Sequence, residues 1–221
     1  ACGDPKALPR VAVLDPELTL TLPKQVTTIT GIDAISHAVE SFVCNKRNAV
    51  SAAYARESFG LTIKHFSAVI VDPASLESRG AMLLGAAYAG LAIENSMLGA
   101  AHSAANPLTA HYGVTHGHAV GLMLPHVVRH NAGDPATASL YEQLAEAGGM
   151  DSVDALIDRL AQLLPESGFA ACLADLNVDR AMIPQLAEEA AGQWTANFNP
   201  RPMNADVFAE LYQQAFTGKD K

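Results

Sequence analysis

Asp33 and His37 stand four residues apart in the stretch GIDAISHAVE, residues 31–40, which is otherwise built mainly from small and apolar residues. Four residues along an α-helix is slightly more than one turn, so both side chains leave the same face of the helix. A carboxylate and an imidazole placed in this way can form one wall of a metal site. The spacing alone is weak evidence, because it arises by chance in many helices.

Most of the eight histidines lie between residues 102 and 130, in surroundings rich in Gly and Ala. We expect His102 to end a long helix of small residues, with a loop at Asn106 following it. His116 is expected to open the next helix behind Thr115, a candidate N-cap. Both imidazoles can then point into one cavity with the helical Asp and His. Three nitrogens and one oxygen suit Fe(II) or Zn(II) and leave a coordination position open for a substrate.

The other histidines are assigned no metal role. His65 should lie on a solvated helix face, and His130 should lie at a helix C-terminus, where the helix dipole favours a cation. His118 follows the last metal candidate by two residues, so on a helix it points about 160° away from it. His111 and His126, like His118, stay ambiguous.

The elements that must position these residues are mostly helices. RVAVLD, residues 10–15, has the short β-branched pattern of a strand and leads into a loop. One strand cannot make a sheet and no initiator methionine precedes it, so we expect the C-terminal part of a longer protein. Helices are predicted at residues 31–44, 49–71, 74–98, 116–129, 136–147, 153–164, 180–191 and 206–216.

The composition indicates one packed globular domain and excludes several partners. Hydrophobic residues make up 49% of the 221 residues and charged residues only 17%, which argues against disorder. The net charge of −9 and the scattered Lys and Arg argue against nucleic acid. The apolar run from residue 80 to residue 93 is shorter than the roughly 20 residues of a membrane span. Cys2, Cys44 and Cys172 show no CxxC spacing, which favours reduced thiols in a cytoplasm.

Three stretches carry a resemblance to a known family: TGIDAISHAVESF, GAAHSAANPLTAHYGVTHGHAVGLMLPHVVRHN and NPRPMNADVFAELYQQA. From RVAVLDPELTLTLP to its end, the chain resembles the C-terminal helical half of the iron-containing alcohol dehydrogenases. The resemblance implies an all-α, multi-helix domain of the dehydroquinate synthase-like fold, with one N-terminal strand left from an absent α/β domain. Residues 1–29 would be the strand and loop remnant of an upstream nucleotide-binding domain, and residues 30–221 the helical metal-binding domain.

In that family an Asp and a His one turn apart, with two later His fourteen positions apart, hold a divalent metal, usually Fe(II) and sometimes Zn(II). The resemblance assigns this role to Asp33, His37, His102 and His116, the same four residues that the spacing groups together. It also implies interconversion of an alcohol with an aldehyde or ketone, in which the metal polarises the substrate oxygen. Members of the family are often homo-oligomers.

Hydride transfer needs a cofactor, because side chains carry no hydride donor. The family binds NAD or NADP through a glycine-rich GGGS-type loop in its N-terminal half, and nothing in this chain matches that loop. The paired glycines Gly148 and Gly149 follow a helix without a preceding strand, so we interpret them as a helix stop. The cofactor would therefore bind through the upstream domain, and we expect the isolated chain to bind metal without turnover.

One departure from the family concerns the proton. Many members have a His at the position of Asn106, implicated in proton transfer, whereas an amide does not titrate near neutral pH. Either a water chain or a neighbour such as His111 relays the proton, or this subgroup does not use the step. Asn106 and His111 are the candidate catalytic residues.

Two other classes of function are open alternatives. A metal-dependent hydrolase with a helical His/Asp site commonly carries adjacent His-Asp pairs, and this sequence contains no such dipeptide. A non-catalytic helical domain with a structural or vestigial metal site would carry the same ligands. A structural metal site and a catalytic one should respond differently when a ligand is removed. The binding free energy of a structural metal is folding free energy, so only its loss should strongly lower the melting temperature.

Overall fold

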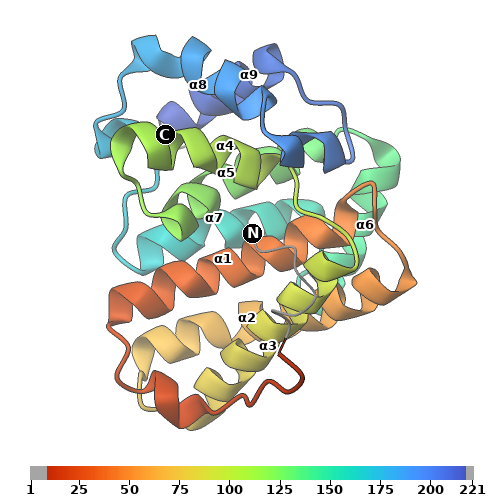
Figure 1. Ribbon diagram of the computed structural model, residues 1–221, viewed down its shortest axis with the longest axis vertical. Coiled ribbons are helices and arrows are strands. Elements are labelled where there is room, and N and C mark those ends of the chain that lie inside the picture. The colour runs from red at the N-terminus through yellow and green to blue at the C-terminus, as the bar shows by residue number, and fades with distance from the viewer. Residues whose placement is uncertain (1–8, 218–221) are drawn as a thin grey trace.

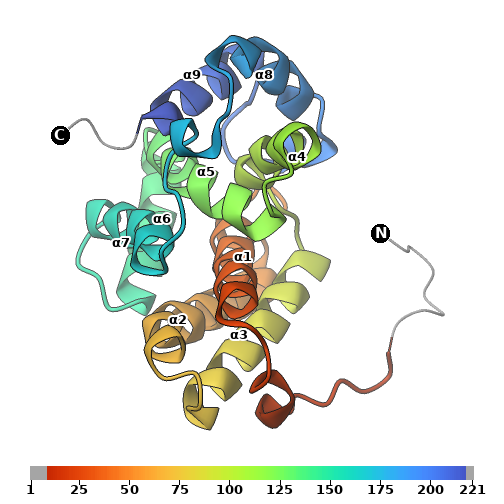
Figure 2. The same cartoon turned by 90° about the vertical axis from the view of Figure 1, so that its left-hand side faces the viewer.

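Helix α1 (Lys24–Val43) lies at the centre of the fold in the computed structural model, which describes residues 9–217. Twelve of its twenty residues are buried. Helices α2 (Ala49–Val71) and α3 (Leu76–Glu94) pack on one side of α1 and α5 (His116–Asn131) on the other (Figure 1). Figure 2 looks nearly along α1 and shows it surrounded by the other helices.

The later helices complete the bundle around α1, and α6 also contacts α2. Helices α8 and α9 pack together and cover α4 and α5, while α6 and α7 pack together and contact α1 and α5 (Figures 1 and 2). These elements are α4 (Ala100–Tyr112), α6 (Pro135–Ala147), α7 (Val153–Glu166), α8 (Ile183–Ala191), α9 (Ala205–Phe216) and the 3-10 helices η2 (Pro16–Thr19), η3 (Ala174–Leu176), η4 (Arg180–Met182) and η5 (Trp194–Phe198).

A single cluster of apolar side chains joins these helices. Phe42 on α1, Phe59 and Phe66 on α2 and Phe208 on α9 are fully buried members of this core. Burying one such side chain contributes about 1.5–3 kcal/mol. Leu108 on α4 and Val120 on α5 belong to the same core, so apolar burial contributes to fixing α1, α4 and α5 relative to one another.

Glycines allow α5 to pass unusually close to α1. A Cβ on Gly117 would overlap the backbone oxygen of Ile29, and a Cβ on Gly121 would overlap the side chain of Ile32. Both glycines lie in the half of α5 that begins with His116. The close crossing therefore brings the first residue of α5 against the ligand face of α1.

The all-α expectation is confirmed for the described residues, and the helix predicted at 49–71 coincides with α2. The first predicted helix begins earlier than expected, at Lys24, because packing overrides the weak helix propensity of the β-branched run at 26–30. The predicted helix stop is also confirmed, since Gly149 follows α6 with a φ of +76°.

The predicted strand at residues 10–15 is absent from the described structure, which has no strand anywhere between residues 9 and 217. Val11 and Val13 are 77% and 84% exposed. A strand needs a partner to satisfy its backbone groups, and none of the described residues offers one.

The remaining expectations concern the N-terminal segment, the cysteines and a membrane span. Cys2 and the first eight residues of the segment 1–29 lie outside the described residues, and the assignment of that segment to an upstream domain stays a prediction. Cys44 and Cys172 are free thiols. Between residues 9 and 217, no helix combines the length and the hydropathy that a membrane span requires.

Candidate metal centre

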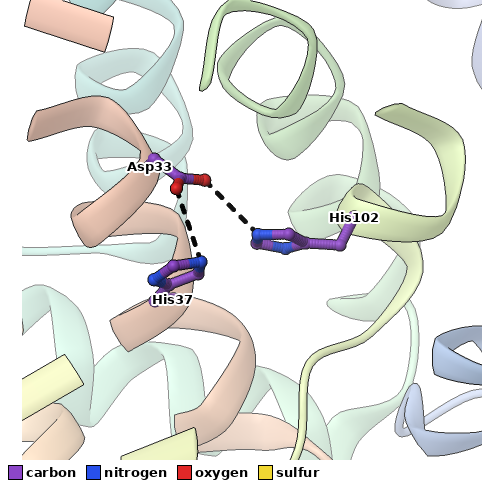
Figure 3. A group of neighbouring side chains, drawn as sticks. All are labelled: Asp33, His37 and His102. Atoms are coloured by element: carbon purple, nitrogen blue, oxygen red, sulfur yellow. Dashed lines mark ion pairs between the residues drawn. The ribbon is translucent and has the colours of Figure 1, made fainter. Parts of the chain in front are cut away.

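Asp33 lies at the centre of a group of three imidazoles. Its Oδ2 lies 3.6 Å from Nε2 of His37, and its Oδ1 lies 3.4 Å from Nε2 of His102 and 3.7 Å from Nε2 of His116. Asp33, His37 and His102 each offer one ligand atom within 4.8 Å of the others. Figure 3 shows the carboxylate between the ring of His37, on the same helix, and the ring of His102, which comes from a different helix.

Three helices deliver these four side chains. Helix α1 presents Asp33 and His37 on one face, as the four-residue spacing predicts, whereas α4 and α5 contribute one histidine each. The rings of His37 and His102 stack with their centroids 4.8 Å apart, and the rings of His102 and His116 lie 5.3 Å apart. The predicted grouping of four residues from three separate parts of the chain is therefore seen in space.

The cluster is buried on one side and open on the other. The side chain of His102 is 4% exposed, those of Asp33 and His37 about a quarter, and that of His116 42%. A small molecule can approach from the side of His116. An opening beside the ligands is what a catalytic metal site needs, because the substrate must reach the ion.

The donor atoms fit a divalent cation. Oδ1 of Asp33 and Nε2 of His102 are buried and have no hydrogen-bond partner, which is costly unless another group binds them. Neighbouring ligand atoms of an ion with bonds of about 2.1 Å lie roughly 3.0–3.4 Å apart. The distances from Oδ1 of Asp33 to Nε2 of His102 and of His116, 3.4 and 3.7 Å, are close to that spacing. One oxygen and three nitrogens suit Fe(II) or Zn(II).

Electrostatic interactions in the cluster shift several pKa values. Burial lowers the pKa of His37 to about 4, and burial also lowers the pKa of His116. Burial acts against the charge of His102 as well, but Glu40 and Asp33 outweigh it and raise the pKa of His102 to about 9. Burial alone would raise the pKa of Asp33, yet the neighbouring imidazoles lower it. Asp33 is thus held in the ionised form that binds a cation.

Glu40 also contacts the cluster, although the spacing of the candidate ligands does not predict it. Its Oε2 lies 2.5 Å from Nδ1 of His102, and its Oε1 accepts a hydrogen bond of 2.6 Å from the backbone N–H of Ala101. A signal for it existed, because Glu40 follows Asp33 by seven residues and so lies on the same face of α1. The pattern could not show which later residue this carboxylate would meet.

The prediction that His102 ends a long helix is wrong. Helix α3 ends at Glu94, and His102 is the third residue of the separate helix α4. The expected loop at Asn106 is also wrong, because Pro107 lies inside α4. A proline inside a helix removes one backbone donor and crowds the carbonyl four residues earlier, and in α4 the tertiary packing outweighs that cost.

Asn106 and His111 occupy different faces of α4. Asn106 follows His102 by about one turn, and its Nδ2 donates a hydrogen bond of 3.0 Å to Oε1 of Gln193. His111 is nine residues from His102, about 180° around the helix, and its Nε2 lies 2.8 Å from a carboxylate oxygen of Glu189. A proton relay through His111 stays a prediction, and it would have to pass around the helix.

His116 and His118, near the N-terminus of α5, point in different directions, as their two-residue spacing predicts. Thr115 occupies the N-cap position, but its side chain makes no capping hydrogen bond. His118 points away from the cluster: its Nε2 lies 2.7 Å from the carbonyl oxygen of Ala170, and its ring packs edge-on against Phe169. His118 is therefore part of the packing between α5 and the segment after α7.

The burial of His126 is expected to make the stability of the fold sensitive to acid, independently of any metal. Its Nδ1 is buried without a hydrogen-bond partner, and burial together with Arg129 lowers its pKa to about 4. Between pH 6.5 and pH 4, His126 is protonated in the unfolded chain but stays neutral in the folded chain. The free energy of unfolding therefore falls as the pH falls. His126→Gln should remove up to about 3 kcal/mol of that fall.

Urea unfolding at pH 7 and pH 4.5 measures this difference. His65→Gln, on the partly exposed face of α2, is the matched control and should retain the pH dependence of the wild type. An equal loss of stability on acidification in the wild type and in His126→Gln would contradict the prediction.

Comparison with known proteins adds independent findings. The family model described as "Fe-containing alcohol dehydrogenase family, C-terminal" matches residues 27–216. The chain is 34% identical to the 1,3-propanediol dehydrogenase of Citrobacter freundii over 215 residues, which cover 95% of this chain and 56% of that protein.

Two solved structures share the fold. A 1,3-propanediol oxidoreductase superposes with a TM-score of 0.87 at 31% identity, over 91% of this chain and 55% of the other. The sulfoacetaldehyde reductase from Bifidobacterium kashiwanohense, in complex with NAD+, superposes with a TM-score of 0.89 at 28% identity, over 96% and 56%. The chain spans about half the length of these relatives.

Proposed function

The chain belongs to the iron-containing alcohol dehydrogenase family, and we propose that it forms the metal-binding, substrate-side domain of an NAD(P)-dependent alcohol dehydrogenase. The reaction is the interconversion of an alcohol with an aldehyde or ketone by hydride transfer. The observation that carries the proposal is the convergence of one carboxylate and three imidazoles, with two of their buried atoms unpartnered.

Asp33, His37, His102 and His116 are the residues that would hold the metal, Fe(II) or in its place Zn(II). When bound, such an ion supplies a Lewis acid that polarises a substrate oxygen. The residues of this chain provide the charge, the ligand geometry and the access that such an ion requires. Asp33 provides the negative charge, three helices fix the imidazoles in place, and the exposed edge of His116 leaves an approach for a small molecule.

Proton transfer and cofactor binding require groups other than the metal ligands. We assign Asn106 an orienting role, since Gln193 fixes its amide and it cannot exchange a proton near neutral pH. The proton then moves through water or through His111, which Glu189 holds. NAD or NADP would bind through an upstream domain, and the NAD+ complex of the sulfoacetaldehyde reductase supports a nicotinamide cofactor.

Further observations bear on the compartment, the substrate and the oligomeric state of the protein. The free thiols of Cys44 and Cys172 support a reducing compartment such as the cytoplasm. The relatives are named for propanediol and sulfoacetaldehyde, which supports a small alcohol or carbonyl compound as the substrate. The family resemblance supports a homo-oligomer.

Elemental analysis of the chain purified without oxygen tests the metal assignment. We expect about one iron or zinc per chain, as four ligands for one ion require, and less than about a tenth of that in His116→Ala. His116 is the ligand of choice because its side chain is 42% exposed, so its removal leaves no cavity in the core. The isolated chain should show no alcohol-dependent NAD reduction.

His65→Ala serves as the matched control and should retain the metal. The proposal fails if the wild type carries no metal and takes up none when Fe(II) or Zn(II) is added. Alcohol-dependent NAD reduction by the isolated chain would instead contradict the placement of the cofactor on an upstream domain.

A further inference from the structure

Glu40 lies directly behind the candidate metal centre. It is 4% exposed and is the only buried carboxylate between residues 9 and 217. Burying an ionised carboxylate is costly unless its oxygens are hydrogen-bonded, and each oxygen of Glu40 has a partner. Oε1 accepts from the backbone N–H of Ala101, and Oε2 lies 2.5 Å from Nδ1 of His102.

We propose that Glu40 is a positioning residue that fixes the tautomer of His102, so that Nδ1 carries a proton and Nε2 is left for the metal. The inference rests on the proposed function. A carboxylate oxygen can only accept, so a ring nitrogen that bonds to it must donate. The other nitrogen, Nε2, then faces Oδ1 of Asp33 at 3.4 Å, among the other ligand atoms.

The same carboxylate also fixes where α4 begins. Gly99 occupies the N-cap position of α4 and has no side chain that could accept from the first free N–H groups. Glu40 replaces that acceptor from a different helix through its bond to Ala101. One side chain therefore sets the start of α4 and the ring orientation of His102, two residues into that helix.

The surroundings of Glu40 are closely packed. A Cβ on Gly99 would lie 3.1 Å from Oε1 of Glu40 and 3.3 Å from Oδ1 of Asn199, so a side chain at this position would crowd the carboxylate. Asn199 is itself fixed, because it exchanges two side-chain hydrogen bonds of 2.8 and 3.0 Å with Asn131. The carboxylate thus sits in a rigid, buried frame.

Glu40→Gln tests the proposal because it keeps the shape of the side chain and replaces one acceptor oxygen with an NH2 donor. The backbone N–H of Ala101 can only donate, so it retains the amide oxygen, and the amide NH2 then faces Nδ1 of His102. Nδ1 must now accept, which places the proton on Nε2, where the metal should bind. We expect zinc affinity, measured by competition with a chelator, to fall about 10–100-fold.

The matched control is Glu57→Gln on the exposed face of α2, which makes the same change in charge and should leave zinc affinity unchanged. A second readout does not depend on the variant folding. In the zinc-loaded wild type, nitrogen NMR should show His102 protonated at Nδ1 and bound through Nε2.

Zinc binding by Glu40→Gln within twofold of the wild type would overturn this inference and leave the proposed function intact. Binding of zinc through Nδ1 of His102 in the wild type would also overturn it. Absence of zinc binding by the wild type itself would contradict the proposed function, and this inference with it.

Discussion

Asp33→Asn is expected to lower metal affinity more than about 100-fold while it shifts the melting temperature of the metal-free chain by no more than about 3 °C. The loss is large because Asp33 supplies the only anionic ligand and lies within 3.7 Å of all three imidazoles. The shift in melting temperature is small because the apolar core, and not a bound ion, holds the ligand-bearing helices together. Chelator competition and thermal unfolding followed by circular dichroism measure the two effects.

This pair of measurements separates a catalytic site from a structural one. A structural metal contributes its binding free energy to folding, so chelation should unfold the protein or lower its melting temperature steeply. A preformed site should keep its helical content after treatment with a chelator. Unfolding of the chelated wild type would favour the non-catalytic domain with a structural metal over the proposed dehydrogenase domain.

Asp33 is a better choice for this test than His102. Removing His102 would leave Glu40, which is 4% exposed, without its partner, and an unpaired buried charge is strongly destabilising in itself. A fall in melting temperature would then report on Glu40 and not on the metal. Asp33 is a quarter exposed, so solvent can compensate its neighbours when its charge is removed.

Local signals in the sequence explain which parts of the fold were predictable. Helix α2 was placed correctly because its start is encoded locally: Asn48 accepts from the backbone N–H of Ser51, and the Ser51 hydroxyl accepts from the N–H of Asn48. Asp33 and His37 were predictable for the same reason, since one helix fixes their relative position. The strand predicted at residues 10–15 is not seen, because a strand needs a partner strand and its own residues cannot supply one.

The second layer of the site depends on packing between distant segments. Glu40 meets His102 across 62 residues of sequence, and this contact exists only because α4 starts beside α1. Helix α4 itself was not predicted, because Asn106 and Pro107 in its middle look like a loop when tertiary packing is unknown. The ligand types were therefore readable from the sequence, whereas the group that orients one of them was not.

Gly117→Ala is expected to lower the free energy of unfolding by about 2–3 kcal/mol and to weaken metal binding at the same time. The added methyl group would overlap the backbone oxygen of Ile29, which cannot move without shifting α1, and it would lie 3.3 Å from Cβ of Asp33. Helix α5 must therefore move away and carry His116 with it. Urea unfolding and chelator competition measure the two losses.

Gly90→Ala is the matched control, because Gly90 lies on the exposed face of α3 with no atom within 4 Å of an added Cβ. It should raise the free energy of unfolding by about 0.5–1 kcal/mol, the usual gain from Ala over Gly in a helix, and leave the metal in place. If Gly117→Ala behaved like Gly90→Ala, the close crossing of α1 and α5 would not be what positions His116. Loss of metal in Gly117→Ala alone would show that the glycine serves the site through the distance between the two helices.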